Sequence, residues 1–249
     1  MCPRDSEPVS SNPGAVSFPS THWSLVLAAG DSTSPDASRA LAELCRRCWY
    51  PLYAYVRRRG YQADDARDLT QEFFARFLEK KYLHLADPQR GRFRTFLLVA
   101  LKHFLIKRWE RAKAAKRGGG YARVPFDIRD AEQRYRSEMA DDLTPEKAYE
   151  QRWALALLEH VQAQLTRDYA AAGKSAQCEA LRIFLWGSSD STSYADVAPR
   201  LGLTESGVKA AVRRLRARYR KILRDEIAQT VASPEELEDE IRWLLTIFE

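Results

Sequence analysis

The stretch "GLTESGVKAAVRRLRARYRKIL", residues 202–223, combines a glycine turn, a helix start and a long amphipathic helix. Its apolar residues recur at spacings of four, three, four and three, which predicts one buried helix face. They are Val208, Val212, Leu215, Tyr219 and Ile222. Because that face has no room for the many cations between them, we expect a dense positive outer surface. It comprises Lys209, Arg213, Arg214, Arg216, Arg218, Arg220 and Lys221.

The residues before this helix complete a helix-turn-helix pattern. An apolar edge runs from Val197 to Leu201, Gly202 permits the turn, and Thr204 is a suitable cap for the second helix. A helix of this width fits the DNA major groove, and its first turns meet the bases. The alternative is a basic helix that is merely solvated. The predicted duplex-binding residues are Thr204, Glu205, Ser206, Lys209, Arg213, Arg214, Arg216 and Arg218.

The composition is that of an ordinary globular protein and leaves room for a polyanionic partner. The chain has 249 residues, of which 45% are hydrophobic and 30% charged, with a formal net charge of +6. That length suits one large domain or two small ones, and we favour two. No β pattern of useful length and no internal repeat occurs, so we predict an all-α fold. It would have two small helical domains joined by a linker, the second carrying the helix-turn-helix.

The domain boundaries follow from shifts in composition. Residues 1–20 are rich in Ser, Pro and Asp and predict a disordered leader. A helical domain is expected over 21–117. Glycines 118–120 open a stretch without periodicity, so the linker is placed at 118–143. The helix-turn-helix domain is expected over 144–231, beginning at a Thr-Pro cap, and an acidic amphipathic helix over 232–249.

Two charged surfaces of opposite sign stand out in the first domain. A helix that starts at Asp64 has its acidic residues largely outside the apolar stripe. A later helix, from about Thr95, is apolar at first and strongly basic in its second half, "LKHFLIKRWERAKAAKR". Its aromatic residues Phe93, Phe96 and Phe104 are expected in the core. A negative patch and a basic helix therefore accompany the predicted DNA-binding helix.

These segments, taken in order, resemble a known family. "ADDARDLTQEFFARFLEK", "GRFRTFLLVALKHFLIKRW" and "SYADVAPRLGLTESGVKAAVRRLRARYR" are similar to the bacterial RNA polymerase sigma factors of the extracytoplasmic-function group. The resemblance covers nearly everything from Trp23 onward. It is greatest for a subgroup with "THWSLVLAA" near the start, "KRGGG" after the basic helix and an acidic C-terminal extension. Gly207 and Arg213 depart from the family pattern, so the promoter sequence is not implied.

The resemblance implies a transcription initiation factor. Such a factor binds core RNA polymerase and directs it to promoters by sequence-specific DNA binding and promoter melting. The acidic helix would bind the polymerase through Asp64, Asp65, Asp68, Gln71 and Glu72. The loop and basic helix would capture the melted minus-ten strand, and residues 204–218 would bind the minus-35 element. The strand-binding residues would be Arg90, Arg92, Arg94, Thr95, Lys102, His103, Lys107, Arg108, Trp109 and Arg111.

Other functions are less well supported by the residues. Cys45 and Cys48 form a single CxxC on an apolar helix side, with no second pair of ligands, so core packing is favoured. We find no catalytic constellation and no phosphate-binding glycine loop, so we expect neither an enzyme nor a cofactor or metal. A free-standing helix-turn-helix regulator is the main alternative, and a thiol-dependent enzyme is a third.

The tail "SPEELEDEIRWLLTIFE", residues 233–249, has a Ser cap followed by Pro. Its predicted apolar face contains Leu237, Ile241, Leu244, Leu245 and Phe248. We hypothesise that it regulates the protein by packing on the basic module or by contacting polymerase; completing the core of the last domain is the alternative. An anti-sigma protein is another possible partner. No secretory signal or membrane-spanning stretch is recognised, so we expect a cytoplasmic location without membrane insertion.

Overall fold

The computed structural model describes residues 23–30, 35–79, 82–114, 132–135, 143–186 and 192–248, and these residues form helices and no strand. The predicted all-α class is confirmed for this part of the chain. The leader 1–20 and the glycines 118–120 lie outside the described residues.

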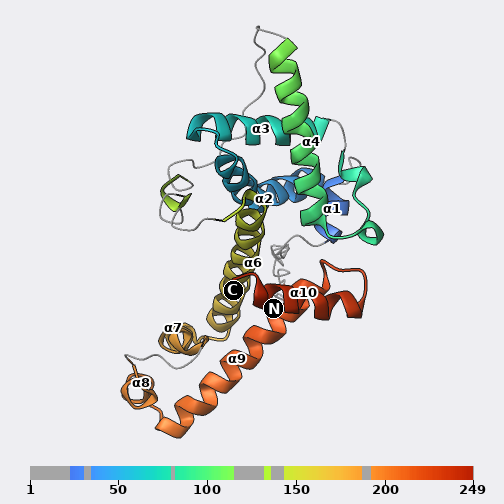
Figure 1. Ribbon diagram of the computed structural model, residues 1–249. Helices are drawn as coiled ribbons and strands as arrows, with labels where there is room; N and C mark the ends of the chain where they lie inside the picture. The colour runs from blue at the N-terminus through green and yellow to red at the C-terminus, as the bar shows by residue number, and fades with distance from the viewer. Residues whose placement is uncertain are drawn as a thin grey trace, which may run out of the picture.

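Most helices fall before and after the predicted linker, within which residues 132–135 are also helical, and Figure 1 shows their arrangement. Those before it are α1 (Trp23–Gly30), α2 (Ala37–Arg58), α3 (Ala63–Glu79), η1 (Tyr82–Leu85), η2 (Pro88–Arg90) and α4 (Phe93–Ala114). Those after it are α6 (Pro145–Ala171), α7 (Ser175–Leu181), η3 (Arg182–Phe184), α8 (Tyr194–Leu201), α9 (Glu205–Ala228) and α10 (Pro234–Thr246).

Side-chain caps fix the starts of the later helices where the sequence predicts them. The hydroxyl of Thr144 accepts a hydrogen bond from the backbone N–H of Lys147 at the start of α6. Thr204 caps α9 and Ser233 caps α10 in the same way. Each cap satisfies a backbone donor that the first helical turn leaves without a partner. The predicted helix starts at 144, 204 and 233 are therefore confirmed.

The first core surrounds α2. Its buried side chains come from α1, α2, α3, α4 and the start of α6, and many are aromatic. Tyr53 and Tyr55 of α2 are fully buried, and Tyr149 of α6 packs edge to face against Tyr55. Cys45 and Cys48 are buried free thiols in the same core, as predicted. Burial raises the pKa of the Cys45 thiol to about 12, so it carries no thiolate at neutral pH.

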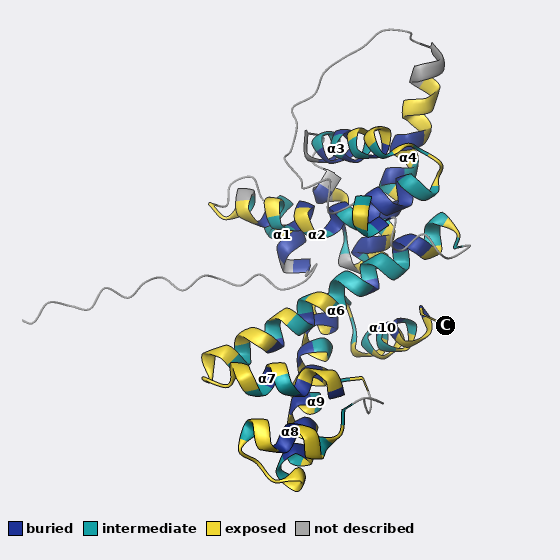
Figure 2. Cartoon of the chain, turned by 90° about the vertical axis from the view of Figure 1, so that its left-hand side faces the viewer, coloured by how far each residue is buried: buried dark blue, intermediate teal, exposed yellow. Residues whose placement is uncertain are grey.

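A second core holds α8 and α9 against α6 and α7, and a third joins α10 to α6 and α9. The long helix α6 contributes to all three, through Tyr149 to the first, Val161 to the second and Ala154 to the third. In Figure 1, α6 runs down the middle from α2 to α7. Figure 2 shows α6 mostly intermediate and exposed, with buried residues at intervals up to Leu165. One rigid helix thus connects the regions that the sequence assigns to separate domains.

Two details differ from the sequence-based expectations. Glu132, inside the predicted linker, accepts hydrogen bonds from Tyr53 Oη at 2.6 Å and Arg57 Nη2 at 3.0 Å, so this part of the linker packs on α2. In the tail, Leu245 and Phe248 are exposed and Ile247 is buried instead. The predicted apolar face was wrong for those two positions: Leu245 lies within α10 on its exposed side, and Phe248 lies in the turn after α10 ends at Thr246.

Candidate nucleic-acid interface

The turn between α8 and α9 is built from local hydrogen bonds. Ser193 and Asp196 form a reciprocal capping box at the start of α8. Gly202 adopts the left-handed conformation with φ 62°, which a residue with a side chain rarely adopts, and Leu203 N–H donates to Ala198 O at 3.0 Å. This closes α8 and starts α9 two residues later. The sequence of short helix, tight turn and long helix is therefore set locally.

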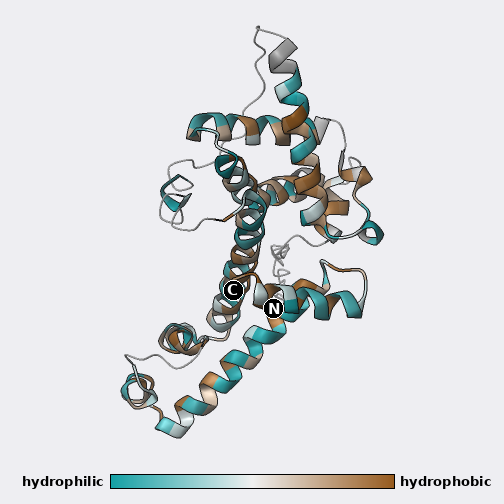
Figure 3. Cartoon of the chain, in the orientation of Figure 1, coloured by the Kyte–Doolittle hydropathy of each residue, from teal (hydrophilic) through white to brown (hydrophobic). Residues whose placement is uncertain are grey.

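The apolar face of α9 lies inward as the spacing predicts. All five of its predicted apolar residues are buried in the second core, including Val208 and Leu215 with no exposed surface. Figure 3 shows the resulting alternation of hydrophobic and hydrophilic colour along α9. The opposite face is thereby held in solvent. It exposes Lys209, Arg213, Arg214, Arg218, Arg220 and Lys221.

Some of these cations have partners and others do not. Lys209 pairs with Glu205 one turn earlier at 2.6 Å, and Arg218 Nε donates to Asp168 of α6 at 2.9 Å. Among the residues that the structure describes, Arg213 and Arg214 make no ion pair. They can therefore meet phosphates or base edges without breaking an ion pair.

Arg216 differs from the outward orientation predicted for it. It is half-buried, and its Nε donates to the backbone carbonyl of Phe184 at 2.8 Å. That bond satisfies a carbonyl at the end of η3 and links it to α9. Thr204, Glu205 and Ser206 are exposed as expected, although the Thr204 hydroxyl is engaged as the helix cap.

The predicted strand-binding residues on α4 and before it are split into two groups. The first is exposed to solvent, and its Trp109 ring is 56% exposed. It comprises Arg90, Thr95, His103, Lys107, Arg108 and Trp109, although Arg90 and Arg108 also pair with Asp87 and Glu72. A groove beside them is lined by the aromatic side chains of α3 and α4, with His103 and Lys107 among its polar residues. The side chain of Arg111 lies outside the described residues.

The second group is occupied by carboxylates of the chain itself. Lys102 Nζ lies 2.7 Å from Glu146 of α6. Arg92 Nε lies 2.7 Å from Glu240 of α10, and Arg94 pairs with the same carboxylate. The Arg94 side chain is only 8% exposed. Burial, with the positive charge of Arg92 beside it, lowers the pKa of Arg94 to about 10, so it stays charged at neutral pH.

The acidic face of α3 is smaller than predicted. Asp64, Asp65 and Asp68 are exposed, and Gln71 is half-buried. The expectation that Glu72 also lies on the outer face is wrong, since it is buried between Arg76 at 2.6 Å and Arg108 at 2.9 Å. The basic helix α4 packs on that side of α3, so the carboxylate is enclosed by cations. The exposed negative patch consists of the three aspartates.

The sequence reasoning missed the acidic residues that face α4. Glu240 is buried, although the tail was treated as an acidic face beside an apolar one. A local signal was present: Glu240 is three positions after Leu237 and four before Leu244, which places it on the apolar side of the helix. A carboxylate in that position requires a buried cationic partner.

The described residues contain no cluster of three or more metal-ligating side chains. No helix in the described part of the chain is both long and apolar enough to cross a bilayer. Comparison of the chain with protein-family models, with curated proteins and with solved structures finds no match.

Proposed function

We propose that this protein is a dissociable transcription initiation factor of the sigma type, which binds core RNA polymerase and brings it to promoter DNA. The proposal depends chiefly on one observation, the exposed cationic face of α9 behind a tight glycine turn. In this proposal α8 and α9 form a helix-turn-helix, and Arg213 and Arg214 lie at the minus-35 bases or phosphates. No catalytic step is required of any residue.

The basic helix α4 supports the second element of the proposal, capture of the melted minus-ten strand. Lys107 and Arg108 are exposed cations of α4, Arg108 with an ion pair to Glu72, and the Trp109 ring is 56% exposed, so a base can stack on its exposed part. Base stacking on an aromatic residue contributes about 1–3 kcal/mol, and cations along a groove hold the backbone. A single strand would use both features, whereas duplex DNA offers no unstacked base.

The third element is the contact with polymerase, for which the exposed aspartates Asp64, Asp65 and Asp68 are the candidates. Asp68 forms an ion pair with Arg67 at its own surface, at 2.9 Å. Exposed pairs of this kind contribute little to stability, so their carboxylates are readily shared with a basic partner.

A free-standing helix-turn-helix regulator is the second candidate, and the burial of Glu72 favours it. A negative patch of three aspartates is a smaller docking surface than the five residues that the sequence suggested. Such a regulator would bind duplex DNA through α9 without polymerase.

Reconstituted transcription separates these candidates. The full-length chain is mixed with core polymerase and genomic fragments, and run-off products and co-purification with polymerase are measured. We expect promoter-dependent products, and their loss with Asp68→Lys at unchanged duplex binding. Arg39→Ala, a change on exposed α2 surface, is the control. If the chain binds duplex DNA but neither co-purifies with polymerase nor directs transcription, the sigma-type proposal is wrong and the regulator remains.

A further inference from the structure

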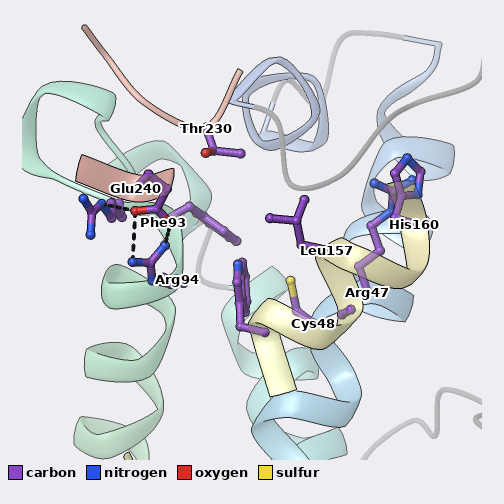
Figure 4. A pocket seen from close by; sticks show the side chains of 11 residues that line it. Arg47, Cys48, Phe93, Arg94, Leu157, His160, Thr230 and Glu240 are labelled. Carbon is purple, nitrogen blue, oxygen red and sulfur yellow. Dashed lines mark hydrogen bonds and ion pairs between the residues drawn. The ribbon is translucent and has the colours of Figure 1, made fainter. Parts of the chain in front are cut away.

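The first residues of α4 form an anion site that is already filled. Arg92 and Arg94 flank the helix start, and the carboxylate of Glu240 lies between them. Arg94 Nη2 reaches Oε2 of Glu240 at 3.1 Å, while Arg92 Nε reaches the same oxygen at 2.7 Å. Figure 4 shows Glu240 facing Arg94 across this contact. Two guanidinium groups and a helix N-terminus are a favourable setting for a phosphate as well as for a carboxylate.

The contact has an aromatic component too. The guanidinium of Arg94 lies 3.7 Å from the centre of the Trp243 ring, one turn after Glu240 on α10. Its backbone carbonyl accepts a hydrogen bond from Tyr149 Oη at 2.9 Å. An anion and a flat ring on α10 therefore meet Arg94 together, the two groups that a nucleotide would also offer.

The charges in this contact are not balanced. Glu240 is one carboxylate against two guanidinium groups. The charge of Glu150 also acts on Arg94 and raises its pKa, so it offsets part of the excess positive charge. With the remaining excess, the site can exchange one anion for another when α10 moves away.

The attachment of α10 divides into two kinds of contact. Its apolar residues, Leu244 and Ile247 among them, pack on α6 and α9 in the third core. Its contact with the start of α4 uses the charge of Glu240 and the ring of Trp243, and Trp243 also packs on the third core. The ion pair of Glu240 is therefore the part of this contact that the apolar core does not hold.

We propose that Arg92 and Arg94 bind a phosphate of single-stranded nucleic acid, and that Glu240 and Trp243 occupy this site as an internal competitor. The inference rests on the proposed function for its ligand, the melted strand. When Glu240 occupies the site, which we call the closed form, α10 covers two of the cations needed for strand capture. Opening would release them without dissolving the core that holds α10 to α6 and α9.

The test compares two isosteric changes on α10 in the full-length chain. Glu240→Gln removes the competing charge, and Asp239→Asn is the matched control. Asp239 is exposed and pairs with Arg242 of the same helix at 2.8 Å. The probe is a fluorescent mixed-sequence DNA single strand of about 12 nucleotides, within the usual site size. Anisotropy titrations give the Kd at several salt concentrations.

We expect Glu240→Gln to bind the strand about tenfold more tightly, because the apparent affinity rises with the open fraction. The salt dependence should steepen by about 0.7 in log–log slope for each phosphate gained, which a purely structural role would not produce. Asp239→Asn should change neither quantity. Equal affinity of Glu240→Gln and the unchanged protein would overturn the inference.

A second variant tests the inference if Glu240→Gln does not fold. Run-off transcription then distinguishes failure of this inference from failure of the proposed function. If circular dichroism shows that Glu240→Gln is unfolded, Trp243→Leu replaces it. This variant should bind the strand about threefold more tightly, since it removes the ring contact with Arg94 and keeps an apolar side chain at the third core; no gain overturns the inference. A protein that directs run-off transcription but shows no gain with the folded variant retains the proposed function and loses only the competitor. If the protein does not direct transcription and no variant binds the strand, both the proposed function and the inference are wrong.

Discussion

The cationic face of α9 and the basic residues around α4 are similar in sequence. They differ in whether their cations are exposed or paired with carboxylates of the chain. On α9, Arg213 and Arg214 are exposed and make no ion pair among the described residues. At the start of α4, Arg92 and Arg94 share the buried carboxylate of Glu240. Positive charge in a sequence thus indicates a polyanionic partner only once the internal anions are located.

The difference has a physical origin in what each helix packs against. The core against which α9 packs is apolar, so Arg213 and Arg214 lie in solvent, although Arg218 pairs with Asp168 of α6. The start of α4 meets α10, whose inner face carries a carboxylate among its apolar residues. A buried charge is tolerated only with a partner, so the two helices determine each other's orientation at that point.

The largest effect is expected on the free energy of unfolding, when the buried pair of Arg94 and Glu240 is broken. Arg94→Met leaves Glu240 with Arg92 alone and removes the contact with Trp243. We expect the free energy of unfolding to fall by about 3 kcal/mol, as for other broken buried pairs. Urea denaturation followed by circular dichroism measures it. Arg90→Met is the control, because Arg90 is 83% exposed, and should cost less than about 0.5 kcal/mol. Equal effects would remove the distinction between the two surfaces.

The next largest effect is expected on the binding of duplex DNA, and not on stability, when a cation of the exposed face of α9 is removed. Arg213→Ala should weaken binding to promoter duplex by about 1–3 kcal/mol if its guanidinium reads a base. If it contacts a phosphate, the log–log salt slope should fall by about 0.9. Unfolding should be unaffected in either case, since the side chain is in solvent. Anisotropy titration against labelled duplex checks this, and binding equal to that of Arg39→Ala would count against α9 as the DNA-binding helix.

The smallest effect concerns Lys102, another α4 cation with an internal partner. The hydrogen bond from Lys102 is the main cause that lowers the pKa of Glu146 below its ordinary value of 4.5. A carboxyl with a lowered pKa stabilises the fold above that value, and the contribution is lost as the pH falls through the lowered pKa. Thermal unfolding at neutral pH and at about pH 3 should therefore show a slightly smaller loss in Glu146→Gln than in the unchanged chain. Both side chains are partly exposed, so screening keeps the difference small. A larger loss in the variant would contradict the assignment.

Local features of this chain were readable from the residues alone. Thr144, Thr204 and Ser233 mark helix starts because a side-chain oxygen satisfies a free backbone donor nearby. Gly202 marks the turn, because its left-handed backbone suits glycine. The inward face of α9 followed from its spacing. Each of these depends on neighbours within about one or two helical turns.

The residues alone did not show which charged side chains are exposed to a partner and which are paired within the fold. Glu72 was expected on the outer face of α3 and is enclosed by Arg108, 36 positions later. Arg94 was expected to face a DNA strand and meets Glu240, 146 positions later. Periodicity can place a carboxylate on the inner side of a helix, as for Glu240, but it does not identify the partner, because both pairings depend on how two helices pack.

The sequence by itself determined the helical class, the helix starts, the buried stripe of α9 and the excess of positive charge. These are properties of short segments, governed by backbone hydrogen bonding and by the burial of apolar surface at fixed spacing. Only the tertiary structure decided that α6 joins all three cores and that carboxylates of α10, α6 and α3 occupy cations of the α4 region. Such pairs form between residues far apart in the chain, because folding removes them from water together and each charge then requires the other.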